Sequence, residues 1–298
     1  MKTGFFKIPA TEGARCLALR LVEECGAAAV RLGSPGDSEA LHDFRVGLHR
    51  LSCLLRDYRD QLPAAVAGLR KELKRLCART NPLRDTEAGI ALLSAFAGKA
   101  GGKEKKSLLA AAGRLESCGS RPRKNFAAVL RREFLVLAVK LRASLADGAA
   151  GGAPGKKKGE LSLAAVNGKA VRRHIRRLRE GLSAVKALSD AYEIHRARLL
   201  AKRLRYILEP EARLDRRVSR LVKKIIRLQL LLGKIHDIQV VCGLLHRCAG
   251  KSGGSEGLEP AMCFVIEKEA EFFRKLKKSW LCGAGSGFFR KLNRYSRR

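Results

Sequence analysis

A His-x-x-Arg pattern occurs twice in the chain, as His42 to Arg45 and as His195 to Arg198. The copies are 153 residues apart, and each continues into an Arg-Leu pair, at Arg50 and Arg203. Guanidinium groups form paired hydrogen bonds to phosphate oxygens, and an imidazole offers one or two N–H donors. The pattern therefore predicts anion binding, and the length of the repeat indicates two copies of one structural unit.

The second copy carries a complete row of candidate ligands. The row consists of His195, Arg198, Lys202 and Arg205, with Arg203 beside it. Because these positions follow at i, i+3, i+7 and i+10, they share one face of a helix in a stripe ~15 Å long. Donors in a line fit a ligand with many phosphates in a row better than a single phosphate.

The first copy is weaker. His42, Arg45 and His49 hold the corresponding positions, but Ser52 stands where the second copy has Arg205. We therefore expect the second copy to dominate binding. For each His, the alternative is a structural role in which the ring bonds a backbone carbonyl. The Arg three residues later on the same face favours an anion contact, or a hydrogen bond that orients that Arg. The two stripes can converge on one cavity or face apart, and the sequence is compatible with both.

Further basic helical segments lie at equivalent places in the two halves. Their candidate ligands are Arg70, Lys71, Lys74 and Arg75 in the first half, Arg172, Arg173 and Arg176 at the start of the second, and Arg220, Lys223, Lys224 and Arg227 beyond it. A charge run on a helix is commonly a solvated face. The recurrence in two copies favours a lined groove or cavity instead.

The net charge points to the same class of partner. The 298 residues include 62 Lys and Arg against 28 Asp and Glu, so 34 cations remain even if every acid is paired. Self-repulsion on this scale destabilises a compact state. An external polyanion, either a polyphosphate, a nucleic acid or an acidic membrane surface, would supply the missing charge, while a solvated basic surface is the simpler alternative.

Signatures of catalysis and of metal binding are missing from the sequence. It contains no G-x-S-x-G, and the P-loop-like fragment at Gly250 to Ser252 lacks the first glycine and a preceding strand. Asp85 and Asp237 each follow a basic residue, so we expect ion pairs that orient a cation rather than acid–base chemistry. We predict no catalytic residue, no bound metal and no cofactor.

The cysteines and the hydropathy predict a cytoplasmic protein. Nine Cys occur with no C-x-x-C, which argues against a disulfide framework or a zinc site. The stretch from Met1 to Pro9 lacks the apolar segment of a signal peptide. No apolar run approaches the ~20 residues that span a bilayer.

Apolar residues recur at intervals of three and four throughout, which predicts an all-α fold. The chain divides into a first half (1–146), a Gly-, Ala-, Pro- and Lys-rich linker (147–159), a second half (160–282) and a basic, loosely held tail (283–298). The stretch 76–93 aligns with 228–245, so the repeat extends beyond the opening motif. We expect two antiparallel bundles of about four helices each, related by a pseudo-two-fold axis.

The repeated motifs resemble the CHAD domain, the conserved histidine α-helical domain, from about Ala14 to Trp280. The residues that carry the resemblance are His42-Asp43-Phe44-Arg45-Val46, Arg50-Leu51, Leu83-Arg84-Asp85, His195-Arg196-Ala197-Arg198, Lys202-Arg203-Leu204-Arg205-Tyr206, Leu208-Glu209, Leu228-Gln229-Leu230-Leu231-Leu232-Gly233 and His236-Asp237. The second-half motif is the more specific of the two. The chain departs from the pattern at His49 and Ser52, where the family usually has basic residues. It departs again at Asn81-Pro82, where the family has an L-G pair.

The resemblance implies two four-helix bundles that bind inorganic polyphosphate through basic residues lining a central cavity. The implied binding positions are His42, Arg45, Arg50, His195, Arg198, Lys202, Arg203 and Arg205. Our leading interpretation is therefore non-enzymatic polyphosphate binding. The alternative is a nucleic-acid-binding protein, although few aromatic residues are present for base stacking. A third hypothesis, an enzyme with His195 as phosphoryl acceptor, lacks a metal-holding carboxylate cluster.

Overall fold

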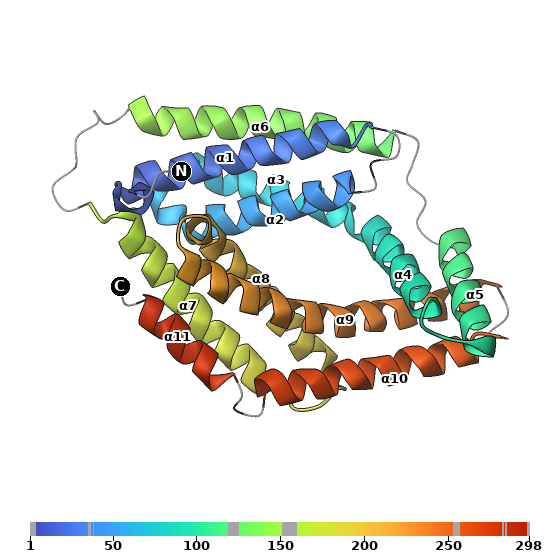
Figure 1. Ribbon diagram of the computed structural model, residues 1–298. Helices are drawn as coiled ribbons and strands as arrows, with labels where there is room; N and C mark the ends of the chain where they lie inside the picture. Colours follow the sequence, from blue (N-terminus) through green and yellow to red (C-terminus); the bar gives the residue numbers. More distant parts are fainter. Residues whose placement is uncertain are drawn as a thin grey trace.

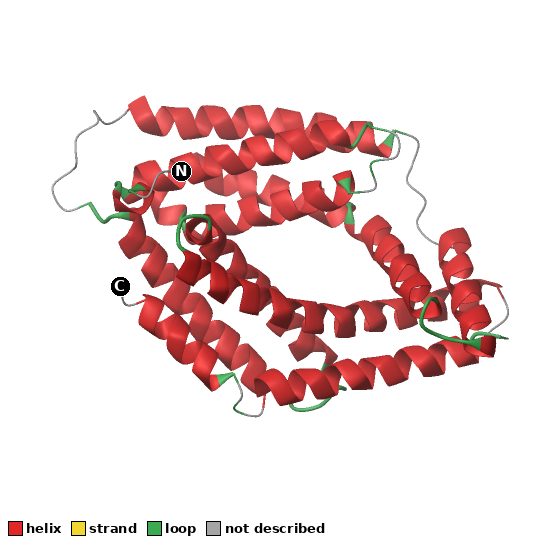
Figure 2. Cartoon of the chain, in the orientation of Figure 1, coloured by secondary structure: helices red, strands yellow, loops and turns green. Residues whose placement is uncertain are grey.

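The chain folds as an array of α-helices (Figures 1 and 2). The computed structural model describes residues 4–34, 37, 39–118, 125–150, 160–252, 257–281, 283 and 285–296. The helices are α1 (Ala10–Arg31), α2 (Ala40–Asp57), α3 (Ala65–Arg79), α4 (Asn81–Ala97), α5 (Gly102–Cys118), α6 (Phe126–Ala150), α7 (Leu163–Ala184), α8 (Ala191–Ala212), α9 (Arg216–Ser252), α10 (Glu259–Leu276) and α11 (Ser286–Ser296). Within the described residues, extended pairing is limited to one isolated bridge between Pro9 and Ser162. The predicted all-α class is confirmed.

The sequence repeat corresponds to a structural repeat with one difference. Helices α1 and α2 correspond to α7 and α8, and the long helix α9 covers the positions of both α3 and α4 at the 152-residue offset. Pro82 lies in the first turn of α4. Because proline has no amide hydrogen and its ring clashes with the preceding turn, a continuous helix is broken there. The equivalent residue of α9 is Lys234, and that helix continues.

The break redistributes the helices among the bundles. Helix α3 packs with α2 and α6, whereas α4 turns away from it and packs with α5 against α9 and α10 of the second half (Figure 1). One bundle therefore consists of α1, α2, α3 and α6, and a second joins α4 and α5 to α9 and α10. Helices α7, α8, α11 and the start of α9 form the third group. The expected assignment of one bundle to each half needs this correction.

Apolar side chains fill the bundles. In the first bundle, the fully buried rings of Phe44 and Phe134 meet edge to face with centroids 5.4 Å apart. Such pairs stabilise a core beyond the area that they bury. On α8, Ile194, Ala201 and Leu204 have no exposed surface. Burial of these faces fixes the rotation of α2 and α8, and with it the direction of their basic faces.

The end of the chain is better ordered than its composition predicts. The expected loose tail contains α11, which packs on α7 and buries Phe288, Phe289 and Leu292. Trp280 meets Phe288 edge to face at 5.2 Å. The prediction was wrong because three large apolar residues on one helical face outweigh the Gly and Ser around them. Of the expected linker, residues 147–150 belong to α6, and 151–159 lie outside the described residues.

Helix α9 is the one described helix whose length and hydropathy would allow a membrane span. Its mean hydropathy reaches 1.4 over an 18-residue window. Ile225, Leu228 and Leu232 have no exposed surface and belong to the hydrophobic core. A core helix of a globular protein passes the same test.

Candidate anion-binding site

The two predicted stripes converge. Helices α2 and α8 pack against each other. Burial lowers the pKa of His49 on α2, and the charges of Lys202 and Arg198 on α8 lower it further. In return, Arg45 acts on the pKa of Lys202. His49 and Lys202 are equivalent residues of the two copies, so their proximity places them near the pseudo-two-fold axis. Arg45, His49, Arg198 and Lys202 are called the central cluster below.

Lys202 is a cation without an acidic partner. It is half-buried, and no carboxylate among the described residues forms an ion pair with it. Burial lowers its pKa to about 8, with a further contribution from the charges of Arg198 and Arg45. Burying a charge without an opposite charge costs free energy. An anion at this position would reverse that cost.

Arg198 also has an unused donor. Its Nε is buried and has no hydrogen-bond partner in the described chain. The guanidinium lies over Gly233 of α9, where a Cβ atom would sit 3.7 Å from Nε. A buried N–H without an acceptor costs about 1–3 kcal/mol. The donor is therefore available to an external acceptor.

Arg45, the equivalent of Arg198, has acceptors within the protein. Its Nη1 donates hydrogen bonds to Thr80 Oγ1 (2.5 Å) and to Asn81 Oδ1 (2.9 Å). The Thr80 hydroxyl in turn donates to the Cys77 carbonyl oxygen at 2.7 Å. Asn81 occupies the position of Gly233 at the 152-residue offset. The same arginine is therefore held in the first copy and left with a free donor in the second.

The repeated histidines are uncharged at neutral pH. Burial and the charge of His236 lower the pKa of His195 to about 4, and burial with the central cations lowers that of His49 to about 3. The pKa of His42 is lowered by burial and by Arg84. The rings of His195 and His236 lie 4.6 Å apart. These shifts favour the uncharged imidazole, and the His49 ring contacts Cys77 Sγ, 3.3 Å from its Nε2.

The contact expected between Asp237 and the preceding basic residue, His236, is present. His236 Nδ1 lies 3.4 Å from Asp237 Oδ1. At the equivalent position of the first copy, Arg84 pairs with Glu87 (3.5 Å) rather than with Asp85.

Within the described residues, no group of three or more His, Cys, Asp and Glu side chains is arranged to hold a metal ion.

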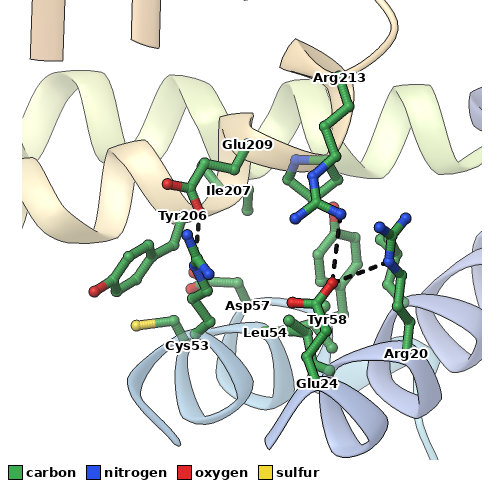
Figure 3. Close-up of a pocket in the computed structure, with 14 residues that line it drawn as sticks. Arg20, Glu24, Cys53, Leu54, Asp57, Tyr58, Tyr206, Ile207, Glu209 and Arg213 are labelled. Atoms are coloured by element: carbon green, nitrogen blue, oxygen red, sulfur yellow. Dashed lines mark hydrogen bonds and ion pairs between the residues drawn. The ribbon is translucent and has the colours of Figure 1, made fainter. Parts of the chain in front are cut away.

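Arg50 and Arg205 share one carboxylate. Arg50 Nε donates to Glu209 Oε2 at 2.8 Å, and Arg205 Nε lies 2.9 Å from Glu209 Oε1 without the alignment of a hydrogen bond. Arg50 and Glu209 both line a cavity of ≈ 50 Å³ between α1, α2 and α8. Figure 3 shows Glu209 beside this cavity. Two predicted ligands thus share one compensating negative charge within the protein.

The remaining candidates lie elsewhere. The pKa of Arg203 is lowered by burial and by Arg56, which places it beside that residue rather than within the cluster. Lys71, Lys74 and Arg75 are exposed on α3 and Arg70 is half-buried, while Arg220, Lys223, Lys224 and Arg227 are exposed on α9. Arg172 donates to the Ser296 carbonyl, Arg173 lies 3.6 Å from Asp57, and Arg176 lies 3.9 Å from Glu180. None of these α3, α7 and α9 cations is among the charges that shift the pKa of His49, His195 or Lys202.

Several residues of the site were not predicted. Glu209 follows Arg205 by four positions on one helix, a spacing that indicates an ion pair. Gly233 inside a helical pattern is typical of a close approach by another group. Asp57 carries no such signal. It pairs with Arg56 and with His174 of α7, contacts set by tertiary structure.

The fold and the site define an internally duplicated, all-helical anion-binding candidate. A family model, CHAD domain, matches residues 18–246. The chain belongs to the CHAD domain family, a family linked with polyphosphate binding. Its fold is similar to the crystal structure of the CHAD domain from the plant Ricinus communis, with a TM-score of 0.68, 19% identity and coverage of 95% of this chain and 92% of that one. No curated protein matches the chain.

Proposed function

We propose that this protein binds inorganic polyphosphate at the central cluster and does not turn it over. One observation carries the proposal: cations from equivalent helices of the two halves meet there, and among the described residues Arg198 Nε has no acceptor and Lys202 has no carboxylate partner. A phosphate chain would provide oxygens to both. Charge-assisted hydrogen bonds of this kind are shorter and stronger than neutral ones.

A linear polyanion suits the site better than a single phosphate. Arg45 on α2 and Arg198 on α8 belong to different helices, and the charges of both act on Lys202. A chain with a negative charge on every phosphate can contact all three at once. The net charge of +34 adds long-range attraction, which raises the rate of encounter.

Calorimetric titration with long-chain polyphosphate at near-physiological salt tests the proposal. We expect binding that weakens steeply as salt rises, because counterions are released from the polyanion. A Lys71→Ala, Lys74→Ala variant is a matched control, since it removes two exposed cations from α3. Undetectable binding, or equal losses in this control and in Arg198→Ala with Lys202→Ala, would overturn the proposal.

Competition distinguishes polyphosphate from nucleic acid. Single-stranded DNA or RNA is added at equal phosphate concentration to the complex formed with labelled polyphosphate. We expect little displacement, since the cluster offers cations and imidazoles rather than a row of aromatic platforms for bases. Efficient displacement would favour the nucleic-acid alternative. Incubation of the protein with polyphosphate tests for turnover. We expect no released phosphate and no phosphohistidine, as for a binding protein.

A further inference from the structure

Glu209 is the acidic side chain nearest to the predicted ligands. Its two carboxylate oxygens contact arginines on two different helices. Oε2 lies 2.8 Å from Arg50 Nε on α2, and Oε1 lies 2.9 Å from Arg205 Nε on α8. The Glu209 side chain is 19% exposed. Both guanidinium groups also face the ring of Tyr206, at 5.8 and 4.9 Å from its centroid. The three charges therefore form one ordered, partly desolvated unit.

This unit adjoins the central cluster. The charge of Arg205 is among those that lower the pKa of Lys202. Arg205 also donates from Nη1 to Gln229 Oε1 of α9 at 3.0 Å. The position equivalent to Glu209 in the first copy is Arg56, so the acid has no counterpart there. The row of cations on α8 is continuous in sequence, but the charge of its last member, Arg205, is partly compensated by Glu209.

We propose that Glu209 is a specificity-determining residue that withholds Arg50 and Arg205 from the phosphate chain and so limits the length of chain in contact with the site. This inference rests on the proposed function. The bound chain contacts Arg45, Arg198 and Lys202 and ends before the Arg50–Glu209–Arg205 unit.

The physical reason lies in the exchange that further contact would require. A phosphate that takes the Nε edge of either arginine must displace a Glu209 oxygen, which leaves a partly buried carboxylate short of one partner. A phosphate that takes the remaining Nη donors lies beside the like charge of that carboxylate. Breaking a desolvated pair on one side is strongly unfavourable. The new contact is therefore offset by the lost one, whereas contacts to Lys202 and Arg198 displace no protein acceptor.

Glu209→Gln tests the inference, because the amide keeps the size of the side chain and an acceptor oxygen but removes the charge. We expect affinity for long-chain polyphosphate to rise at least about fivefold. The logarithmic salt dependence should steepen by roughly 1.5, as two added contacts contribute about 0.7–0.9 each in nucleic-acid systems. In a series of chains of defined length, affinity should also level off at a longer chain than in the wild type.

Two further variants make the test specific. Arg205→Gln should change the salt slope little in the wild type, but should cancel much of the gain in the Glu209→Gln background, and the double-mutant cycle measures this coupling. A structural role alone would lower affinity in Glu209→Gln without changing the slope or the chain-length limit. That result, or an unchanged slope in a folded variant, would overturn the inference.

The inference and the proposed function fail in different ways. Absence of polyphosphate binding by the wild type and every variant overturns both. Tight wild-type binding with an unchanged slope in Glu209→Gln overturns the inference alone. Thermal unfolding of each variant identifies a loss of fold, and Arg50→Gln in the Glu209→Gln background, which should again reduce the slope, repeats the test from α2.

Discussion

Arg45 and Arg198 occupy the same position in the two copies of the repeat but differ in what the protein has already bound to them. Arg45 donates to Thr80 and Asn81, whereas Arg198 lies over Gly233 with its Nε unsatisfied. By residue type alone the two copies are equal at this position, since each has one arginine there. The comparison teaches that an anion site is defined by donors that the protein leaves unpaired, and not by the number of basic residues.

The origin of the difference lies on the facing helices. In the first half the helix is interrupted before Pro82, between α3 and α4. Asn81, at this interruption, offers an acceptor to Arg45. In the second half α9 is continuous and presents Gly233, which has no side chain to accept a hydrogen bond. A local change in the helix therefore alters the availability of an arginine on another helix.

The largest effect is expected from removal of the unpaired donors. Arg198→Ala with Lys202→Ala should weaken polyphosphate binding by roughly 100-fold or more, because each charge-assisted hydrogen bond contributes about 1.5–3 kcal/mol. His42→Ala with Arg45→Ala should cost less than tenfold, since Arg45 already has protein acceptors. Titration calorimetry measures both. Equal losses would remove the distinction between the copies.

A smaller effect is expected when the second copy is given the acceptor of the first. Gly233→Asn places an amide near Arg198, as Asn81 lies near Arg45, and should weaken polyphosphate binding by roughly three- to tenfold. Gly233→Ala is the matched control, because its Cβ would make only an ordinary contact at 3.7 Å with the flexible Arg198. The control should bind like the wild type and gain about 0.5–1 kcal/mol of stability. Identical binding by the two variants would contradict the role assigned to the unpaired Nε.

The binding should depend on pH through Lys202. Its pKa is about 8 in the free protein, so the protonated fraction, and with it the attraction for phosphate, falls as pH rises from 7 to 9.5. We expect a loss of roughly threefold or more over this range. Cys77, which also acts on Lys202, has its pKa raised by burial and stays neutral over most of the interval. Lys202→Arg should abolish the dependence, and a similar decline in that variant would exclude Lys202 as its source.

The smallest effect concerns stability. A lysine whose pKa is lowered from 10.5 to about 8 on folding binds fewer protons when folded, so the free energy of unfolding rises with pH between these values. Lys202→Met should remove this rise and increase the melting temperature at pH 7 by about 1–3 °C. The measurement is thermal unfolding at pH 7 and 9.5 without ligand. A lower melting temperature at pH 7 would mean that Lys202 has a stabilising partner.

Much of the fold could be predicted from local patterns. The recurrence of apolar residues predicts the all-α class. The break between α3 and α4 also has a local cause, because the backbone chemistry of Pro82 acts within one turn. The ordered α11 was missed, since its stability comes from burial of Phe288 and Phe289 against α7 rather than from local composition. The packing of α4 and α5 on α9 and α10 also depends on contacts between distant segments.

The sequence by itself determined the duplication, the helical class and the set of cations from which the site is drawn. These follow from residue type and helical spacing, which act over a few residues. Tertiary structure alone decided that His49 and Lys202 approach each other, that Glu209 also pairs with Arg50 of a distant helix, and that Arg198 is left over Gly233. The physical reason is that the availability of a charge depends on its burial and its partners, and both are set by how α2, α8 and α9 pack.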